Sequence, residues 1–284
     1  MSVLEVKNLT HTYGGNTPFV NDAVKGVSFT AEKGEIIGII GHTGSGKSTL
    51  VQHLNGLLKP TSGEILLDGV NIWENPKDIR KVRSKVGLVF QYPEYQLFEE
   101  TVFKDIAFGP KNMGLTGEEL EKRVIDTCNM IGVKPEYYEK SPFDLSGGEK
   151  RRVAIAGVMA MNPEVIVFDE PTAGLDPKGR DDVTEIIANY RRHTGATVII
   201  ISHSMEDMAD KLLVMNKGRL WMFGTVEEVF KNGEELRKIG LNVPIVTRVF
   251  YELKKAGIPV PDDVFTVDRA VRVLKEIRDG GGNA

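Results

Sequence analysis

Four short stretches of the chain consist almost entirely of apolar residues, and each has the length of a strand. Runs of this length that are rich in Val and Ile are typical of buried strands, whereas a bilayer span needs about 20 apolar residues. We therefore predict buried strands at residues 36–40, 86–90, 165–168 and 197–201.

The rest of the first 235 residues combines half-exposed strand patterns with helical patterns. Residues 2–9 alternate between two faces, residues 27–30 and 64–69 read as a strand and a strand followed by a turn, and residues 212–223 predict a hairpin. Helical patterns occupy residues 50–58, 78–85, 118–131, 150–161, 181–192 and 225–231, and residues 102–160 as a whole are expected to be mostly helical. Strands that alternate with helices predict an α/β domain.

The composition shifts near Gly240, after which two short amphipathic helices are expected, at residues 244–253 and 266–277. Two such helices cannot bury both of their faces alone, so they must pack on the main domain or on another subunit. We therefore divide the chain into a domain at residues 1–235 and a helical appendage at residues 240–284, a possible dimerisation element. The last five residues read as a frayed tail.

The segment Gly41-His42-Thr43-Gly44-Ser45-Gly46-Lys47-Ser48-Thr49 stands between a predicted buried strand and a predicted helix. It fits the phosphate-binding pattern G-x-x-x-x-G-K-[ST], in which glycines let backbone N–H groups turn toward an anion at a helix N-terminus. Lys47 is then placed to reach the β- and γ-phosphates, and Ser48 to bind Mg²⁺. The alternative is a chance glycine turn before a helix, which the flanking strand and helix argue against.

Two acids, Asp169 and Glu170, end the predicted strand 165–168. Buried strands do not normally finish with adjacent acids unless these have a function, and in a phosphate-loop protein such an acid binds Mg²⁺. Glu170 is then placed to orient or activate a water. His203 follows the strand 197–201. A lone histidine is more often structural, but the strand end of an α/β sheet is where ligands gather.

Three further features have two interpretations each. Tyr13, beside a glycine turn, either packs on the surface or stacks on a base. Ser146-Gly147-Gly148, ahead of a helix, is an anion site or a capped helix start, and the residues alone favour the cap. Residues 92–98, which mix aromatics, acids and a proline, form either an exposed contact surface or a solvated loop whose aromatics fold back.

Composition excludes some classes of protein. The chain has 284 residues and a net charge of −4, which provides no general attraction to nucleic acid. Its single cysteine, Cys128, excludes an internal disulfide, fits a reducing compartment and lies in a helical pattern typical of a packed core thiol. The N-terminus lacks a signal-peptide pattern, so a cytosolic protein, or one held at a membrane by partners, is expected.

Taken in order, these features resemble the motifs of the ATP-binding-cassette (ABC) ATPase family over about residues 2–230. Tyr13 matches the aromatic A-loop, the segment 41–49 Walker A, Gln91 the Q-loop, and Leu145-Ser146-Gly147-Gly148-Glu149 the signature. Residues 165–169 match Walker B, Glu170 the catalytic glutamate, residues 174–176 the D-loop and His203 the switch histidine. Glu149 departs from the Gln of many members, a tolerated variation.

The resemblance implies an α/β fold of the phosphate-loop NTPase type, with an antiparallel β-subdomain, a helical signature subdomain at about 95–160 and the C-terminal appendage. It also implies composite sites, each with ATP between Walker A of one subunit and the signature of another. Tyr13, residues 41–49 and the partner's Ser146, Gly147 and Gly148 then contact ATP, and Ser48, Gln91 and Asp169 arrange Mg²⁺. Glu170 is implied as the general base, with His203 and Gln91 as further catalytic residues.

Residues 90–102, FQYPEYQLFEETV, are similar to the Q-loop segment of energy-coupling-factor (ECF) transporter ATPases, with cobalt/nickel importer ATPases as relatives and the A′ type favoured. This implies an ATPase that energises import of a micronutrient, a vitamin or a transition-metal ion. The implied partners are a second ABC ATPase, a transmembrane coupling subunit that docks near Gln91–Glu100, and a separate membrane substrate-binding subunit. Glu94, Glu99 and Glu100 are candidate partners for arginines of the coupling subunit.

The implied location is the cytoplasmic face of the cell membrane, as a peripheral protein, and no nucleic acid is expected as a partner. The alternatives are a soluble ABC ATPase that acts on DNA or ribosomes and a regulatory subunit that binds ATP without hydrolysing it. The acidic chain has neither a long coiled-coil insertion nor a second cassette, which disfavours the first. The presence of Glu170 and His203 disfavours the second.

Overall fold

The computed structural model describes residues 2–15, 20–202 and 208–280. Within these ranges the larger sheet has six strands in the order β10-β9-β3-β8-β7-β6. Its strands are β3 (Ile36–Ile40), β6 (Val86–Val89), β7 (Val165–Asp169), β8 (Thr197–Ile201), β9 (Lys211–Asn216) and β10 (Arg219–Thr225). All pairs are parallel except the hairpin β9–β10. The carboxyl ends of β3, β6, β7 and β8 therefore lie at one edge of the sheet.

The second sheet is antiparallel, and its described strands follow the order β2-β1-β4-β5. They are β1 (Ser2–Tyr13), β2 (Asn21–Glu32), β4 (Ser62–Leu67) and β5 (Val70–Asn71). Strands β1 and β2 extend well beyond the predicted segments 2–9 and 27–30, because polar residues such as Thr12 and Asp22 continue the ladder. The pairing partner, rather than the local apolar pattern, determines where these strands end.

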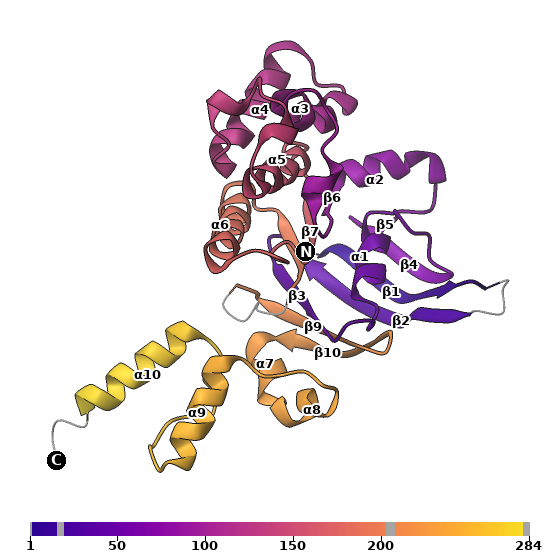
Figure 1. Cartoon of the computed structure of the whole chain (residues 1–284). Coiled ribbons are helices and arrows are strands. Elements are labelled where there is room, and N and C mark those ends of the chain that lie inside the picture. Colours follow the sequence, from indigo (N-terminus) through magenta and orange to yellow (C-terminus); the bar gives the residue numbers. More distant parts are fainter. Residues whose placement is uncertain (1, 16–19, 203–207, 281–284) are drawn as a thin grey trace.

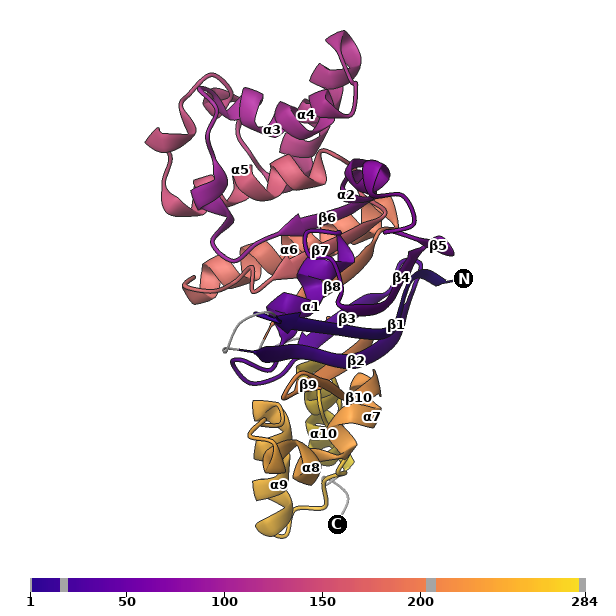
Figure 2. The same cartoon turned by 90° about the vertical axis from the view of Figure 1, so that its right-hand side faces the viewer.

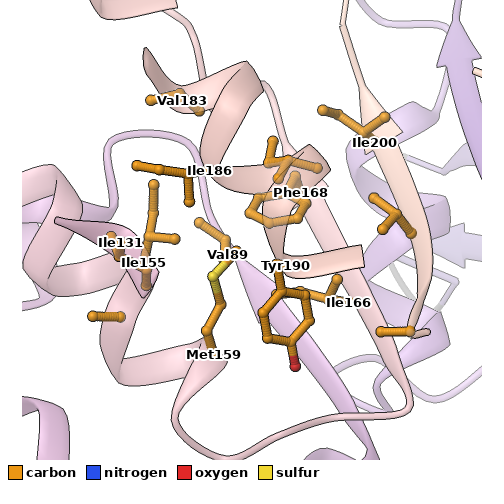
Figure 3. Close-up of a cluster of buried hydrophobic side chains, with 14 of the residues drawn as sticks. Val89, Ile131, Ile155, Met159, Ile166, Phe168, Val183, Ile186, Tyr190 and Ile200 are labelled. Atoms are coloured by element: carbon orange, nitrogen blue, oxygen red, sulfur yellow. The ribbon is translucent and has the colours of Figure 1, made fainter. Parts of the chain in front are cut away.

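The apolar runs are continuous because both faces of the large sheet are covered (Figure 1). On β7, Val165 and Val167 join a core with β1, β2, β4 and helix α1 (Lys47–Leu54). The alternate residues, Ile166 and Phe168, join a second core formed with the helices, which Figure 3 shows around Phe168 and Tyr190. Cys128 is buried in this second core, and burial raises the pKa of its thiol to about 11, so it is a packed thiol as predicted.

Helices α3 (Val102–Asn112), α4 (Gly117–Ile131) and α5 (Gly147–Met159) gather at one end of the molecule (Figures 1 and 2). Helix α3 contains Gly109 and Pro110, two residues of low helix propensity, so its sequence predicts a helix only weakly. Gly109 allows close packing, since a Cβ there would lie 2.6 Å from Met161 Cγ. The other helical elements between β5 and β8 are α2 (Ile79–Lys85), α6 (Pro177–Thr194) and the 3₁₀ turns η1 (Pro76–Asp78), η2 (Pro93–Gln96), η3 (Pro135–Tyr137) and η4 (Pro142–Asp144).

The C-terminal helices lie at the opposite end from α3–α5 (Figures 1 and 2). They are α7 (Val226–Lys231), α8 (Gly233–Lys238), α9 (Ile245–Lys255) and α10 (Val267–Gly280). Helices α9 and α10 enclose a small core of their own around Phe250 and Val264, and Phe265 contacts Phe230 of α7 with ring centroids 6.1 Å apart. No helix of the described ranges is long and apolar enough to cross a membrane.

Candidate nucleotide-binding site

The loop between β3 and α1 packs closely against β2 and the β9–β10 hairpin. A Cβ at Gly41 would lie 2.4 Å from Met215 O, and one at Gly46 would lie 2.3 Å from Ala23 O. Gly46 also has a φ of 99°, which L side chains rarely adopt. The N–H of Gly218 donates to Ser45 O at 3.0 Å, so the hairpin turn supports the loop. Glycine is therefore required by close backbone approach at both ends of the motif.

Helix α1 begins at Lys47, directly after this loop, and no side chain of the described residues caps its N-terminus. Its first N–H groups are thus available to an anion, which the helix dipole also favours. They border a cavity of about 740 Å³, a size typical of small-molecule sites. The other borders of the cavity include Tyr13, Gln91 and Glu170, and they come from β1 and the ends of β6 and β7.

The side chain of Lys47 folds back over the loop. Its Nζ donates to Gly41 O at 2.7 Å and to His42 O at 3.1 Å, and the residue is 7% exposed. Burial lowers the pKa of Lys47, and the charges of Glu170 and Asp169 oppose that shift. A positive charge with so little hydration is suited to bind phosphate oxygens.

Ser48 and Asp169 meet beside Lys47. The Ser48 hydroxyl donates to Asp169 Oδ1 at 3.2 Å. Burial raises the pKa of Asp169, against the hydrogen bond from Ser48 that lowers it. A hydroxyl beside a carboxylate is the hard-oxygen donor set that Mg²⁺ prefers, with phosphate oxygens and waters as its other ligands. Among the described residues, no group of three His, Cys, Asp or Glu side chains is placed to hold a metal. This donor set fits a metal that arrives with a nucleotide.

The backbone turns away from the direction of β7 at Glu170, directly after the strand ends. The φ of Glu170 is 49°, and its N–H donates to Ile201 O at 3.1 Å, across to the end of β8. Its Oε2 accepts a hydrogen bond of 3.1 Å from Gln91 Nε2, at the end of β6. Two predicted catalytic residues, 79 positions apart in sequence, are therefore in direct contact. The third, His203, lies outside the described residues.

Tyr13 lies at the mouth of the cavity. Its ring meets His11 edge-on with centroids 4.4 Å apart, and its hydroxyl is 3.4 Å from Thr49 Oγ1. The ring is thus partly supported by packing and still 41% exposed. Both sequence-based interpretations, surface packing and base stacking, are compatible with this geometry.

The predicted helix cap at Ser146 is present. Ser146 caps α5 in a capping box, in which Glu149 Oε2 accepts hydrogen bonds from the N–H (2.8 Å) and hydroxyl (2.6 Å) of Ser146. The bonds from Ser146 and Tyr137 lower the pKa of Glu149 to about 2. Gly147 and Gly148 are exposed. Neither they nor Ser146 are among the described residues that line the loop cavity. A single chain therefore does not unite the signature with its own loop 41–49.

Comparison with known proteins decides the family. A family model for ABC transporters matches residues 24–173. The energy-coupling factor transporter ATP-binding protein EcfA2 of Caldanaerobacter subterraneus is 51% identical over 279 residues, 97% of this chain and 98% of the relative. The EcfA2 of Clostridium perfringens is 53% identical over 96% of this chain and 98% of the relative. The chain belongs to the ABC transporter family, among its ECF transporter ATP-binding proteins.

Solved structures agree with this assignment. The cbiO1 protein of Clostridium perfringens, part of the ABC transporter complex cbiONQ, has a TM-score of 0.74 and 38% identity over 89% of this chain and 99% of its own. The ATP-binding cassette MJ0796, solved as a dimer bound to ADP and Pi, has a TM-score of 0.70 and 28% identity over 78% of this chain and 98% of its own. The ECF resemblance and the ABC ATPase fold are confirmed, and ATP hydrolysis coupled to transport is the activity of this ATP-binding protein.

The Q-loop segment of this ECF ATPase presents aromatic side chains outward. Tyr95 is 84% exposed and Phe98 56% exposed, the latter packed edge-on against Phe108 of α3. This favours the exposed contact surface over aromatics that fold back. The expectation that Glu94 pairs with an arginine of the coupling subunit is wrong. Its side chain turns inward and pairs with Arg151 of the same chain. Glu100 pairs with Lys104 at 2.6 Å on the surface.

Sequence reasoning missed several residues that build the site. Lys217 and Gly218 line the loop cavity, as do residues 21–23 and Lys25 of β2. The turn 216–219 was predictable as a hairpin, but its sequence contains no phosphate-binding motif. Arg151 was also missed, because in the run Lys150-Arg151-Arg152 it looks like part of a charged helix face.

Proposed function

We propose that this ATPase energises the import of a micronutrient, a vitamin or a transition-metal ion, through an ECF-type membrane complex. The similarity to ECF transporter ATP-binding proteins supports the import, and the observation that carries ATP hydrolysis is the convergence of three pairs at one cavity. These are Lys47 with the loop carbonyls, Ser48 with Asp169, and Gln91 with Glu170. Together these pairs provide groups that bind phosphate, a position for the metal ion, and a carboxylate next to that position. ATP hydrolysis needs all three.

In this proposal each residue of the site has one task. Lys47 and the amides of residues 41–49 hold the phosphates, Tyr13 stacks on adenine, and His203 senses the γ-phosphate. Ser48, Asp169 and Gln91 hold Mg²⁺, which supplies charge neutralisation when bound. Glu170 takes the proton of the attacking water. Because the protein forms no covalent bond to the substrate, positioning and electrostatics carry the rate.

A second ABC ATPase, related or identical, completes each site. The exposed Ser146, Gly147 and Gly148 of one subunit then contact the γ-phosphate held by the other. We divide the chain for this purpose into the nucleotide-binding domain 1–235, with its helical subdomain at about 95–160, and the appendage 240–284. Exposed apolar residues of the appendage support a role in dimerisation; they are Ile245, Val249, Val267, Val271 and Leu274.

A transmembrane coupling subunit docks near Gln91–Glu100. Support comes from a groove of about 680 Å³ among the Q-loop segment, α2, α3 and α5, lined in part by Gln96, Phe98, Phe108 and Met113. Apolar and aromatic walls of this kind suit the face of a helix. The protein is then peripheral on the cytoplasmic face of the membrane, and a separate membrane subunit binds the solute.

Gentle detergent purification of the tagged full-length chain from its native cells tests this function. We expect a second ATPase and membrane subunits to be recovered with it, together with ATP hydrolysis. Lys47→Ala serves as a control, because it should remove hydrolysis without removing the partners. Recovery of ribosomes or DNA-processing proteins in place of membrane subunits would contradict the proposal.

A further inference from the structure

Arg151, on the first turns of α5, is a buried cation that joins three separate segments. It is 4% exposed. Its Nε and Nη2 donate to the two carboxylate oxygens of Glu94, at 2.9 and 2.7 Å. Its Nη1 donates to the carbonyls of Pro171 at 3.2 Å and Ala173 at 2.8 Å. One guanidinium thus bridges the signature helix, the Q-loop segment and the loop after β7.

The geometry of this cluster is specific to a guanidinium. The fork of Arg151 engages Glu94 in two parallel bonds while a third nitrogen turns toward the loop, which a lysine ammonium cannot reproduce. Burial raises the pKa of Glu94, but the hydrogen bonds and charge of Arg151 outweigh it and leave that pKa lowered. The carboxyl group of Glu94 is therefore charged at neutral pH. The guanidinium also lies 5.7 Å from the ring centroid of Tyr92.

The two carbonyls bound by Arg151 belong to the turn that orients Glu170. Pro171 follows Glu170 directly, and the N–H of Ala173 donates back to Glu170 O at 3.1 Å. Glu170 itself occupies the left-handed region, which its surroundings must stabilise. Arg151 is not among the described residues that line the nucleotide cavity. Its influence on ATP therefore passes through the segments that it binds, and of these the turn 170–173 leads directly to Glu170.

We propose that Arg151 is a positioning residue for ATP hydrolysis, which ties the Q-loop segment to the turn 170–173 and so holds the carboxylate of Glu170 in place. Glu94 connects the proposed docking surface for the membrane subunit to the same guanidinium. A displacement of the Q-loop segment is then transmitted to Glu170 through one side chain. This inference rests on the proposed role of Glu170 as general base.

The test is the conservative variant Arg151→Lys in the complex that is purified with the full-length chain. Misplacement of a catalytic group lowers turnover without weakening substrate binding, so kcat should fall about 10- to 100-fold and KM for ATP should stay within about twofold. Arg123→Lys is the matched control. Arg123 also belongs to the helical subdomain and donates to a backbone carbonyl, Ala160 O, on a different segment from the turn 170–173.

Glu94→Gln provides a second, independent test, in which Arg151 keeps its carbonyl partners but loses its counter-charge. We expect a smaller fall in kcat, again at unchanged KM. The double variant should be no slower than Arg151→Lys alone, because both changes act through one link. If Arg151→Lys does not fold, the kcat and KM of Glu94→Gln alone test the inference.

Wild-type kcat in Arg151→Lys, or in a folded Glu94→Gln when the first variant does not fold, overturns the inference. A loss confined to KM also overturns it. The proposed function fails separately, if the wild-type complex itself does not hydrolyse ATP or if Glu170→Gln hydrolyses it normally.

Discussion

At the scale of single residues, neighbours in sequence have very different environments. Asp169 still belongs to β7, is 6% exposed and accepts from Ser48. Glu170, one position later, has left the strand through a positive φ and meets Gln91 instead. This difference in backbone direction separates the carboxylate that we propose to bind Mg²⁺ from the carboxylate that we propose to act on water.

We therefore expect Glu170→Gln to bind ATP normally and to lose about 10²- to 10⁴-fold in turnover, which is the usual contribution of a general base to the rate. The amide has the shape of the carboxylate but cannot take a proton. ATP titration and phosphate release measure the two effects. Glu164→Gln, at the opposite end of the same strand and paired with Lys85, is the matched control. Near-normal hydrolysis by Glu170→Gln would remove this residue from the role.

At the scale of elements, the first turns of α5 contain both a capping box and the buried Arg151. Its capping box satisfies the N–H groups of Ser146 and Glu149 and leaves Gly147 and Gly148 exposed. One turn further, Arg151 ties the helix to the turn 170–173. The helix start is therefore fixed on one side and accessible on the other, as the proposed contact of this surface with a second subunit requires.

The capping box makes α5 sensitive to acid. The pKa of Glu149 is lowered from 4.5 to about 2, so its contribution to stability is complete above about pH 4.5 and is lost as the pH falls toward 2. Urea unfolding midpoints, measured between pH 5 and pH 2, should therefore fall more steeply for the wild type than for Glu149→Gln. Glu118→Gln is the control, because it removes an acid from the first turn of α4, where no described side chain caps the helix. Equal slopes for the wild type and Glu149→Gln would refute the effect.

At the scale of the whole molecule, the proposed contact surfaces lie at opposite ends. The Q-loop segment and α3 form one end, and the C-terminal helices form the other (Figures 1 and 2). The nucleotide loop lies between them, at the edge where the parallel strands of the large sheet end. This arrangement lets a membrane subunit and a dimerisation contact act on the same site from different sides.

Phe98→Ser should weaken capture of the membrane subunits and leave ATP affinity unchanged. Loss of an exposed aromatic anchor costs about 2 kcal/mol, or roughly a 30-fold weaker complex. Quantitative co-purification measures it. Trp221→Ser, which removes a comparably exposed aromatic from β10, should leave capture intact. Equal recovery from the Phe98 and Trp221 variants would place the docking surface elsewhere.

The sequence by itself determined the phosphate loop, the buried strands, the capped start of α5 and the order of the motifs. The first three are each encoded within a few neighbouring residues, through glycine conformation, apolar runs or a four-residue cap, and the order of the motifs is read directly along the chain. Only the tertiary structure decided that Gln91 meets Glu170, that β1 and β2 are long, and that the signature lies away from its own loop. It also decided that Glu94 is committed to Arg151, 57 residues away. The reason is that a charged side chain's partner depends on which segments the folded core brings together, and no local pattern records that.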